Sequence, residues 1–210
     1  KRQHDEWGVD VTVSASQKGL MLPPGLSFTA ISEKALLASH SSGFAKSYWR
    51  WDDRLMANGN GLLPYTPATN LLYGLQEAIQ MLEEEGLQNV YARHNRHAEA
   101  TRRAVRAWGL EVLCADPAEY SSSLTAVMMP EGFDADELLA LILNKFDMCL
   151  GIGLGKVKGK IFRIGHLGYF NDLMLAGTLS GLEMGLSLAG IPFSKGGAGA
   201  ALEYLEETLR

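Results

Sequence analysis

Apolar and polar positions alternate near the start of the chain. Residues 9–13 read Val-Asp-Val-Thr-Val, which is the period of two that is typical of a strand. Residues 26–31 form a second apolar run, and the Pro-Pro-Gly stretch at 23–25 predicts a turn before it. We expect a second strand there, followed by a short helix at 32–39 that Ser32 caps.

Residues 40–64 show no regular period. They are rich in aromatic residues and glycine, so we expect a long loop, and loops of this length are usually functional. A helical stripe of apolar residues then extends from Leu71 to Leu82. Thr66 is expected to cap this helix with Pro67 at its first position, and Gly86 is expected to end it.

The rest of the chain alternates between helical and strand patterns. Helices joined to strands by short connections favour an α+β arrangement, with the helices packed on one face of a sheet. The expected helices are 87–108, 134–146 (started by a capping-box-like Asp134 and Glu137), 171–188 and a short terminal helix after a hinge at 195–197; the expected strands are 110–114, 124–129, 148–150 and 160–164.

Composition narrows the class of protein. The 210 residues are 47% hydrophobic with a formal net charge of −5, which is typical of a globular chain and gives no support to a general nucleic-acid binder. The apolar stretch 173–191 contains Glu183, so it indicates a buried helix rather than a membrane span. Two cysteines far apart in sequence suggest a reducing compartment, and we expect a cytoplasmic protein.

Lys18 is the first candidate for chemistry. It follows the first predicted strand, and a lysine held in a cleft can form a Schiff base with an aldehyde cofactor because desolvation frees its amine. The alternative is a solvated lysine beside a turn.

Two further residues suit anionic groups. Thr66 at a helix N-terminus could bind a phosphate, or it could be a plain N-cap. Arg163 lies between apolar residues on a short predicted strand, so it should point to the face opposite its neighbours. There its planar fork could hold a carboxylate, and the alternative is a structural ion pair.

Two other patterns carry weaker signals. The glycine run 151–155 resembles a nucleotide-binding loop, but another strand follows it where a helix is needed, so we interpret it as a flexible hairpin. His94 and His97 have a spacing that could bind a metal. The surrounding arginines oppose a cation, and we therefore expect a solvated helix face and no metal site.

Two motifs together resemble a known family. The first is Ser16-Gln17-Lys18-Gly19-Leu20-Met21-Leu22-Pro23-Pro24-Gly25, and the second is Phe162-Arg163-Ile164-Gly165-His166-Leu167-Gly168. In this order and at this separation they resemble the class V aminotransferases, above all the serine–glyoxylate and alanine–glyoxylate aminotransferases. The segment 163–185, with Asn171-Asp172-Leu173-Met174, is more similar to the serine–glyoxylate branch.

The resemblance implies a role for each candidate. Lys18 would carry pyridoxal 5′-phosphate (PLP) as a Schiff base, and Gln17 would lie by the cofactor phosphate. Thr66 would reach that phosphate from the neighbouring subunit of a homodimer with a shared active site. Arg163 would bind the α-carboxylate of the substrate. The loop 40–64 would border the site, which makes weaker candidates of Tyr48, Trp49 and Tyr65.

The resemblance also implies a division of the chain. Members of the family are about twice as long, and the carboxylate that pairs with the pyridine nitrogen of PLP lies farther upstream of the lysine than the 17 residues available here. We therefore expect the C-terminal portion of an α/β, fold type I PLP-dependent transferase. Residues 1–85 would be the end of the large PLP-binding domain, and residues 86–210 the small α+β domain.

The implied reaction transfers an amino group from serine, or from alanine, to glyoxylate, giving glycine and a keto acid. The freed amine of Lys18 would act as general base and acid between the substrate Cα and the cofactor C4′. No nucleic acid or membrane partner is expected. Two alternatives stay open. One is a binding or dimerisation module without catalysis as an isolated fragment. The other is a class V PLP lyase or desulfurase, which is less favoured because Cys149 is expected to be buried.

Overall fold

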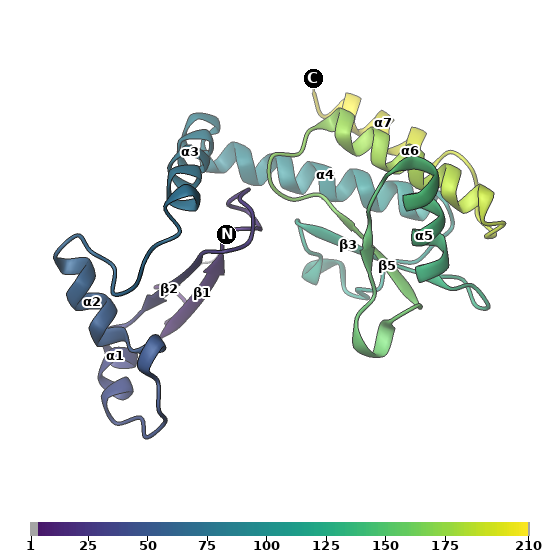
Figure 1. The fold of residues 1–210 in the computed structure, drawn as a ribbon. Helices are drawn as coiled ribbons and strands as arrows, with labels where there is room; N and C mark the ends of the chain where they lie inside the picture. Colours follow the sequence, from purple (N-terminus) through teal and green to yellow (C-terminus); the bar gives the residue numbers. More distant parts are fainter. Residues whose placement is uncertain (1–3, 210) are drawn as a thin grey trace. The chain divides into compact units, whose positions relative to one another are not determined.

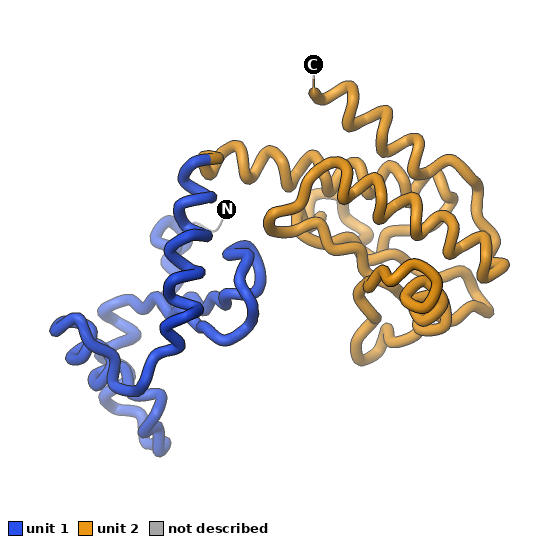
Figure 2. The backbone as a smooth tube through the Cα atoms, turned by 45° about the horizontal axis from the view of Figure 1, so that its top comes forward, with its two compact units in different colours: residues 1–84 blue, residues 85–210 orange. Residues whose placement is uncertain are grey.

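The chain divides into two units, residues 1–84 and residues 85–210 (Figure 2). The computed structural model describes residues 4–209. Figure 1 shows the strands β1 and β2 in the first unit and the strands β3 and β5 in the second. Each unit is therefore described by itself.

The first unit begins with the two strands that the alternation predicts. Strands β1 (Val11–Ala15) and β2 (Ser27–Ile31) pair antiparallel. Helix α1 (Glu33–His40) follows, and the backbone N–H of Ala35 donates to Oγ of Ser32 at 3.1 Å. The predicted strands, the helix and its cap are confirmed.

The expected irregular loop at 40–64 is wrong, because it contains a helix. A 3₁₀ turn at Ser47–Trp49 precedes helix α2 (Trp51–Gly59). Asp52 and Asp53 lie in the first turn of α2, where carboxylates stabilise the helix dipole. Gly61 has a φ of +70°, so the chain leaves the helical conformation just after α2.

Helix α3 (Thr69–Glu85) starts later than the sequence predicts. Its first helical bond joins the N–H of Leu72 to the carbonyl of Ala68 at 3.1 Å, and the N–H of Thr69 donates to Pro67 at 3.0 Å in a tight turn before it. Thr66 therefore lies upstream of the helix rather than at its cap. Gly86, with a φ of +80°, ends α3 as predicted.

Within its described residues, 85–209, the second unit combines four α-helices with a three-stranded antiparallel sheet in the order β3-β5-β4. Two 3₁₀ turns, at Pro117–Glu119 and Gly155–Val157, lie in the connections. The elements are α4 (Leu87–Ala107), β3 (Leu124–Met128), α5 (Ala135–Phe146), β4 (Gly151–Ile152), β5 (Ile161–Gly165), α6 (Asp172–Leu188) and α7 (Gly197–Glu207) (Figure 1).

Two of the predicted strands are displaced or incomplete. Residues 110–114 contribute only an isolated bridge between Val112 and Val127. The strand expected at 148–150 lies instead at β4, where Gly151 pairs with Arg163. The prediction was wrong because the apolar run just before the glycines was read as the strand, whereas the pairing with β5 uses the glycine run itself. The predicted hairpin in the glycine run is confirmed.

The core of the second unit lies between its helices and one face of the sheet. Phe162 and Ile164 of β5 are fully buried there, together with apolar residues from α4, α5, α6 and α7. Helix α6 buries Leu175, Leu179 and Leu182, which confirms the buried helix predicted for this stretch. Among residues 4–209, no helix is both long enough and apolar enough to cross a membrane.

Helix α7 is anchored through a carboxylate of α6. Oε2 of Glu183 accepts hydrogen bonds from Nε1 of Trp108 at 2.8 Å and from the N–H of Ala198 at 2.9 Å, and Oε1 accepts from the N–H of Gly196 at 2.8 Å. Burial opposes ionisation of Glu183, but these bonds outweigh it and hold its pKa below the ordinary value. The ionised carboxylate thus satisfies the free N–H groups at the start of α7.

Candidate active site

Lys18 and Gln17 lie in the loop that joins β1 to β2. Both side chains are exposed. The N–H of Met21 donates to the carbonyl of Lys18 at 3.0 Å and closes a tight turn, and Met21 has a φ of +61°, which is uncommon for a residue with a side chain. The exposed side chain of Lys18 therefore extends from a tight turn of the backbone.

Helix α3 lies directly against this loop. A Cβ atom added to Gly74 of α3 would be 2.7 Å from Cδ2 of Leu22, and one added to Gly25 would be 2.5 Å from Cδ1 of Leu71. The two glycines thus allow backbone and side chain to approach where a larger residue would push the loop away. The loop that carries Lys18 is therefore packed against helix α3.

Thr66 is exposed and precedes α3 in the same unit. Tyr65, which precedes Thr66 in sequence, packs against Tyr48 with ring centroids 4.8 Å apart, and the Trp49 ring lies 6.1 Å from that of Tyr48. Trp49 is 72% exposed. The aromatic residues of segment 40–65 thus form a partly exposed cluster, and the phosphate role of Thr66 stays a prediction.

Arg163 occupies the central strand of the sheet in the second unit. The residues directly opposite it are small: Ala126 on β3 and Gly151 on β4. Since cross-strand partners share a face of the sheet, these small residues leave room for the arginine side chain. Phe162 and Ile164 point the other way into the core, so the predicted alternation is confirmed.

The guanidinium of Arg163 is oriented by a backbone carbonyl. Its Nε donates to the carbonyl of Ile152 at 2.7 Å. A Cβ atom at position 151 would lie 3.0 Å from Cβ and 3.2 Å from Nε of Arg163, so glycine there permits the observed rotamer. With Nε used, the two terminal nitrogens form the edge that can bind both oxygens of a carboxylate.

His94 and His97 are buried, so the expected solvated helix face is wrong. Nε2 of His94 accepts from the N–H of Gly168 at 3.1 Å, and its Nδ1 contacts the carbonyl of Val90 at 2.7 Å. This geometry fits the neutral ring with its proton on Nδ1. The prediction failed because the segment after β5 covers this face of α4, a contact far apart in sequence. Among the described residues, no group of three or more His, Cys, Asp or Glu is placed to hold a metal.

Asp172 at the start of α6 connects the same face of α4 to the segment after β5. Both of its oxygens accept from Arg96, at 2.6 and 2.9 Å, and Oδ1 also contacts Nε2 of His97 at 2.8 Å. Burial lowers the pKa of His97 despite this partner. Nearby, Arg93 binds Glu85 and the carbonyl of Gly168. Helix α4 therefore holds the chain in place just beyond the strand that carries Arg163.

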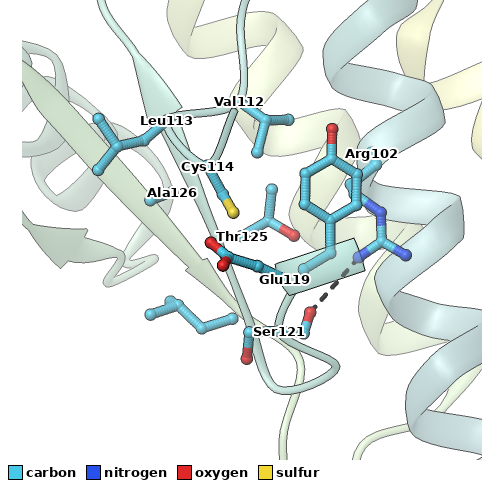
Figure 3. Close-up of a pocket in the computed structure, with 10 residues that line it drawn as sticks. Arg102, Val112, Leu113, Cys114, Glu119, Ser121, Thr125 and Ala126 are labelled. Atoms are coloured by element: carbon cyan, nitrogen blue, oxygen red, sulfur yellow. Dashed lines mark hydrogen bonds between the residues drawn. The ribbon is translucent and has the colours of Figure 1, made fainter. Parts of the chain in front are cut away.

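A cavity of about 210 Å³ lies beside β3 in the second unit (Figure 3). Its wall includes Arg102, whose guanidinium lies 4.8 Å from the Tyr120 ring and donates to the carbonyl of Ser121 at 3.4 Å. None of the four residues predicted for cofactor and substrate lines it. Its lining does include Ala126, the residue opposite Arg163 on the neighbouring strand. Elsewhere in this unit Cys149 is exposed, so its expected burial is wrong.

Comparison with known proteins identifies the family. Residues 2–156 match the family model of the class-V aminotransferases (Aminotransferase class-V), and the chain belongs to this family. Its predicted fold class, a fold type I PLP-dependent transferase, is likewise confirmed.

Individual relatives are similar over nearly the whole chain. The serine–glyoxylate aminotransferase of Methylorubrum extorquens is 46% identical over 209 residues, and the L-aspartate–glyoxylate aminotransferase of Paracoccus denitrificans is 44% identical over 208; each alignment covers 97% of this chain and 52% of the relative. The crystal structure of pyridoxamine–pyruvate aminotransferase from Mesorhizobium loti superposes with a TM-score of 0.90 at 29% identity, covering 99% of this chain and 54% of that one. The chain thus spans about half the length of the curated relatives it matches.

Two parts of the site were missed at the level of sequence. Gly151 and the carbonyl of Ile152 set the orientation of Arg163, yet we interpreted the glycine run as a flexible hairpin with no role in the site. The available signal was the predicted hairpin itself, because a hairpin places its glycines beside the strand that carries Arg163.

Proposed function

We propose that this chain is part of a PLP-dependent aminotransferase that transfers the amino group of serine to glyoxylate. The observation that carries the proposal is Arg163, whose free guanidinium edge is prepared for a carboxylate between two small residues. The α-carboxylate is the group that serine and other α-amino donors share. The names of the similar enzymes support glyoxylate as the acceptor and serine as the donor.

The residues present fit pyridoxal 5′-phosphate. Lys18 offers an exposed primary amine on an anchored loop, which is what attachment of an aldehyde requires. Gln17 beside it offers an amide that can donate to a phosphate, and Thr66 offers a hydroxyl. We assign these three side chains to the cofactor. Bound pyridoxal phosphate would supply the sink for the electrons of the bond broken at the substrate Cα.

Arg163 and Lys18 each have a defined task in the proposed reaction. Arg163 binds the donor through its carboxylate and so fixes the orientation of the bond at Cα. Lys18 holds the cofactor between turnovers and, once its amine is released, takes the proton from Cα as a general base. The same amine then returns the proton as a general acid. Water would supply the oxygen of the keto acid that leaves, and the reverse sequence with glyoxylate would give glycine.

We propose that the two units are the end of the large PLP-binding domain and the small domain, with the boundary at residue 85. The protein would act in the cytoplasm as a homodimer with a shared active site, in which Thr66 serves the neighbouring subunit. The exposed aromatic cluster of Tyr48, Trp49 and Tyr65 supports an interface in the first unit. The two free cysteines support a reducing compartment.

The direct test is turnover by the full-length protein that carries this chain. Serine with glyoxylate and PLP is expected to give glycine and hydroxypyruvate, and serine is expected to have a higher kcat/KM than alanine or aspartate. Release of pyruvate and ammonia from serine without glyoxylate would indicate a lyase instead. Absence of any reaction from full-length protein saturated with PLP would contradict the proposal.

A second test concerns the orientation of Arg163. Gly151→Ala places a methyl group against Cβ and Nε of Arg163, so the guanidinium must turn. A hydrogen bond to a charged group contributes about 1.5 kcal/mol, which corresponds to roughly a tenfold rise in KM for serine. Because Arg163 also fixes the orientation of the bond at Cα, kcat should fall as well, so that kcat/KM falls more than tenfold. Steady-state kinetics of the full-length variant measure both.

The matched control is Gly165→Ala at the end of the same strand. A Cβ atom at position 165 has no neighbour within 4 Å. Its KM for serine should equal that of the unmodified protein. Equal KM values for the Gly151 and Gly165 variants would show that position 151 does not orient the arginine.

A further inference from the structure

We propose that Ser16 is a positioning residue that fixes Lys18 for its reaction. This inference rests on the proposed function, because it assigns Ser16 a purpose through Lys18. Ser16 is fully buried at the end of β1, whereas the two residues after it are exposed. Ser16 is thus the last buried residue of the chain before the exposed residues that include the lysine.

The hydroxyl of Ser16 accepts the hydrogen bond that its backbone carbonyl would accept in a regular strand pair. Its N–H donates to the carbonyl of Leu26 at 3.1 Å, as a paired strand residue does. The N–H of Leu26, however, donates to Oγ of Ser16 at 3.2 Å. The serine hydroxyl therefore continues the hydrogen-bonding ladder between β1 and β2 by one step beyond the last strand pair, Ala15 with Ser27.

The carbonyl released in this way shapes the loop. It accepts from the N–H of Leu22 at 3.1 Å, and Oγ of Ser16 donates to the carbonyl of Pro23 at 2.7 Å. Ser16 thus makes four hydrogen bonds to the far side of its own loop. Residues 17–21 must close between Ser16 and Leu22, and this short span contains Lys18.

Removal of the hydroxyl has a defined consequence. Alanine at position 16 would leave the N–H of Leu26 and the carbonyl of Pro23 without their buried partner, which is costly. The loop would relax to pair these groups otherwise, and Lys18 would move with it. A displacement of about 1 Å of a reacting group costs up to roughly 100-fold in rate.

The experiment compares four forms of the full-length protein with the unmodified one. They are Ser16→Ala, Ser16→Cys, which keeps the volume with a weak hydrogen-bonding group, Ser16→Thr, which restores a hydroxyl, and Ser14→Ala on the exposed part of β1 as the matched control. Four quantities are measured: amide hydrogen exchange at Leu26 without added PLP, the fraction of added PLP fixed on Lys18 by borohydride, kcat for serine and KM for serine.

For Ser16→Ala and Ser16→Cys we expect faster exchange at Leu26, less PLP fixed on Lys18, and a kcat lowered roughly 10- to 100-fold. KM for serine should stay close to that of the unmodified protein. Ser16→Thr should restore most of the kcat, and Ser14→Ala should change none of the four quantities. A variant that only destabilised the unit would lower the amount of folded enzyme and leave kcat per bound PLP unchanged.

The inference is overturned if Ser16→Cys keeps the kcat of the unmodified protein, or if exchange at Leu26 increases while fixation of PLP and kcat do not change. The proposed function is judged separately on the unmodified protein. Failure to fix PLP on its Lys18 would contradict that function. If Leu26 exchange then also stayed slow in Ser16→Ala, the anchoring role of the hydroxyl would be contradicted as well.

Discussion

Replacing Lys18 with alanine is expected to lower turnover of serine and glyoxylate by at least about 100-fold and up to about 10,000-fold, the usual contribution of a general acid–base group. Covalent attachment of PLP should disappear with the amine. The free energy of unfolding should not change, because Lys18 is exposed and no hydrogen bond or ion pair of its amine is found among the described residues. Single-turnover kinetics and mass spectrometry after borohydride treatment measure the two losses.

Lys145→Ala is the matched control, since Lys145 is also an exposed lysine but lies at the end of α5. It should retain full turnover and PLP attachment. Substantial turnover by Lys18→Ala at saturating PLP would assign the proton transfer to another residue and would remove the central element of the proposed mechanism.

Gly197→Ala is expected to have the largest effect on stability. A methyl group there would overlap Nε1 of Trp108 and lie 2.6 Å from the carbonyl of Ala104. Overpacking of this kind costs about 1–3 kcal/mol. The hydrogen bonds that Glu183 makes to Trp108 and the start of α7 would be disturbed as well. We expect a loss of about 3 kcal/mol in the free energy of unfolding, measured by denaturation in urea.

Gly199→Ala in the same helix provides a control with the opposite sign. Position 199 has no neighbour within 4 Å of an added Cβ, and it lies inside α7. Alanine there should stabilise the protein by about 0.5–1 kcal/mol, because glycine loses more backbone entropy in a helix. Similar destabilisation by both substitutions would mean that α7 does not tolerate any change, and that the contact with Trp108 is not the cause.

Much of the local structure could be predicted from the sequence because local rules decide it. The alternation in residues 9–13 and the Ser32 cap were sufficient for β1, β2 and α1. The apolar stripe after Leu71 was sufficient for α3. Its start was misplaced because Pro67 can occupy either a first helical position or a turn, and only the hydrogen bond from Leu72 to Ala68 distinguishes the two.

Contacts between distant residues could not be predicted in this way. The burial of His94 depends on Gly168, which lies 74 residues away. The orientation of Arg163 depends on a carbonyl, a group that every residue has and that carries no signal in the sequence. Lys18 and Arg163 were singled out from their positions beside and within predicted strands, and the resemblance to a family supplied their expected roles, whereas the groups that hold them required the structure.

The way in which the guanidinium of Arg163 is held has a consequence for any attempt to change the amino donor. Its Nε donates to the carbonyl of Ile152, and Ala126 and Gly151 flank it. In the proposed reaction it would bind the carboxylate, the part that all α-amino acids have in common. Selectivity for serine over larger or acidic donors must therefore come from the residues around the donor side chain. An effort to redesign the donor preference should leave this arginine and its two small neighbours untouched and vary the residues that contact the donor side chain.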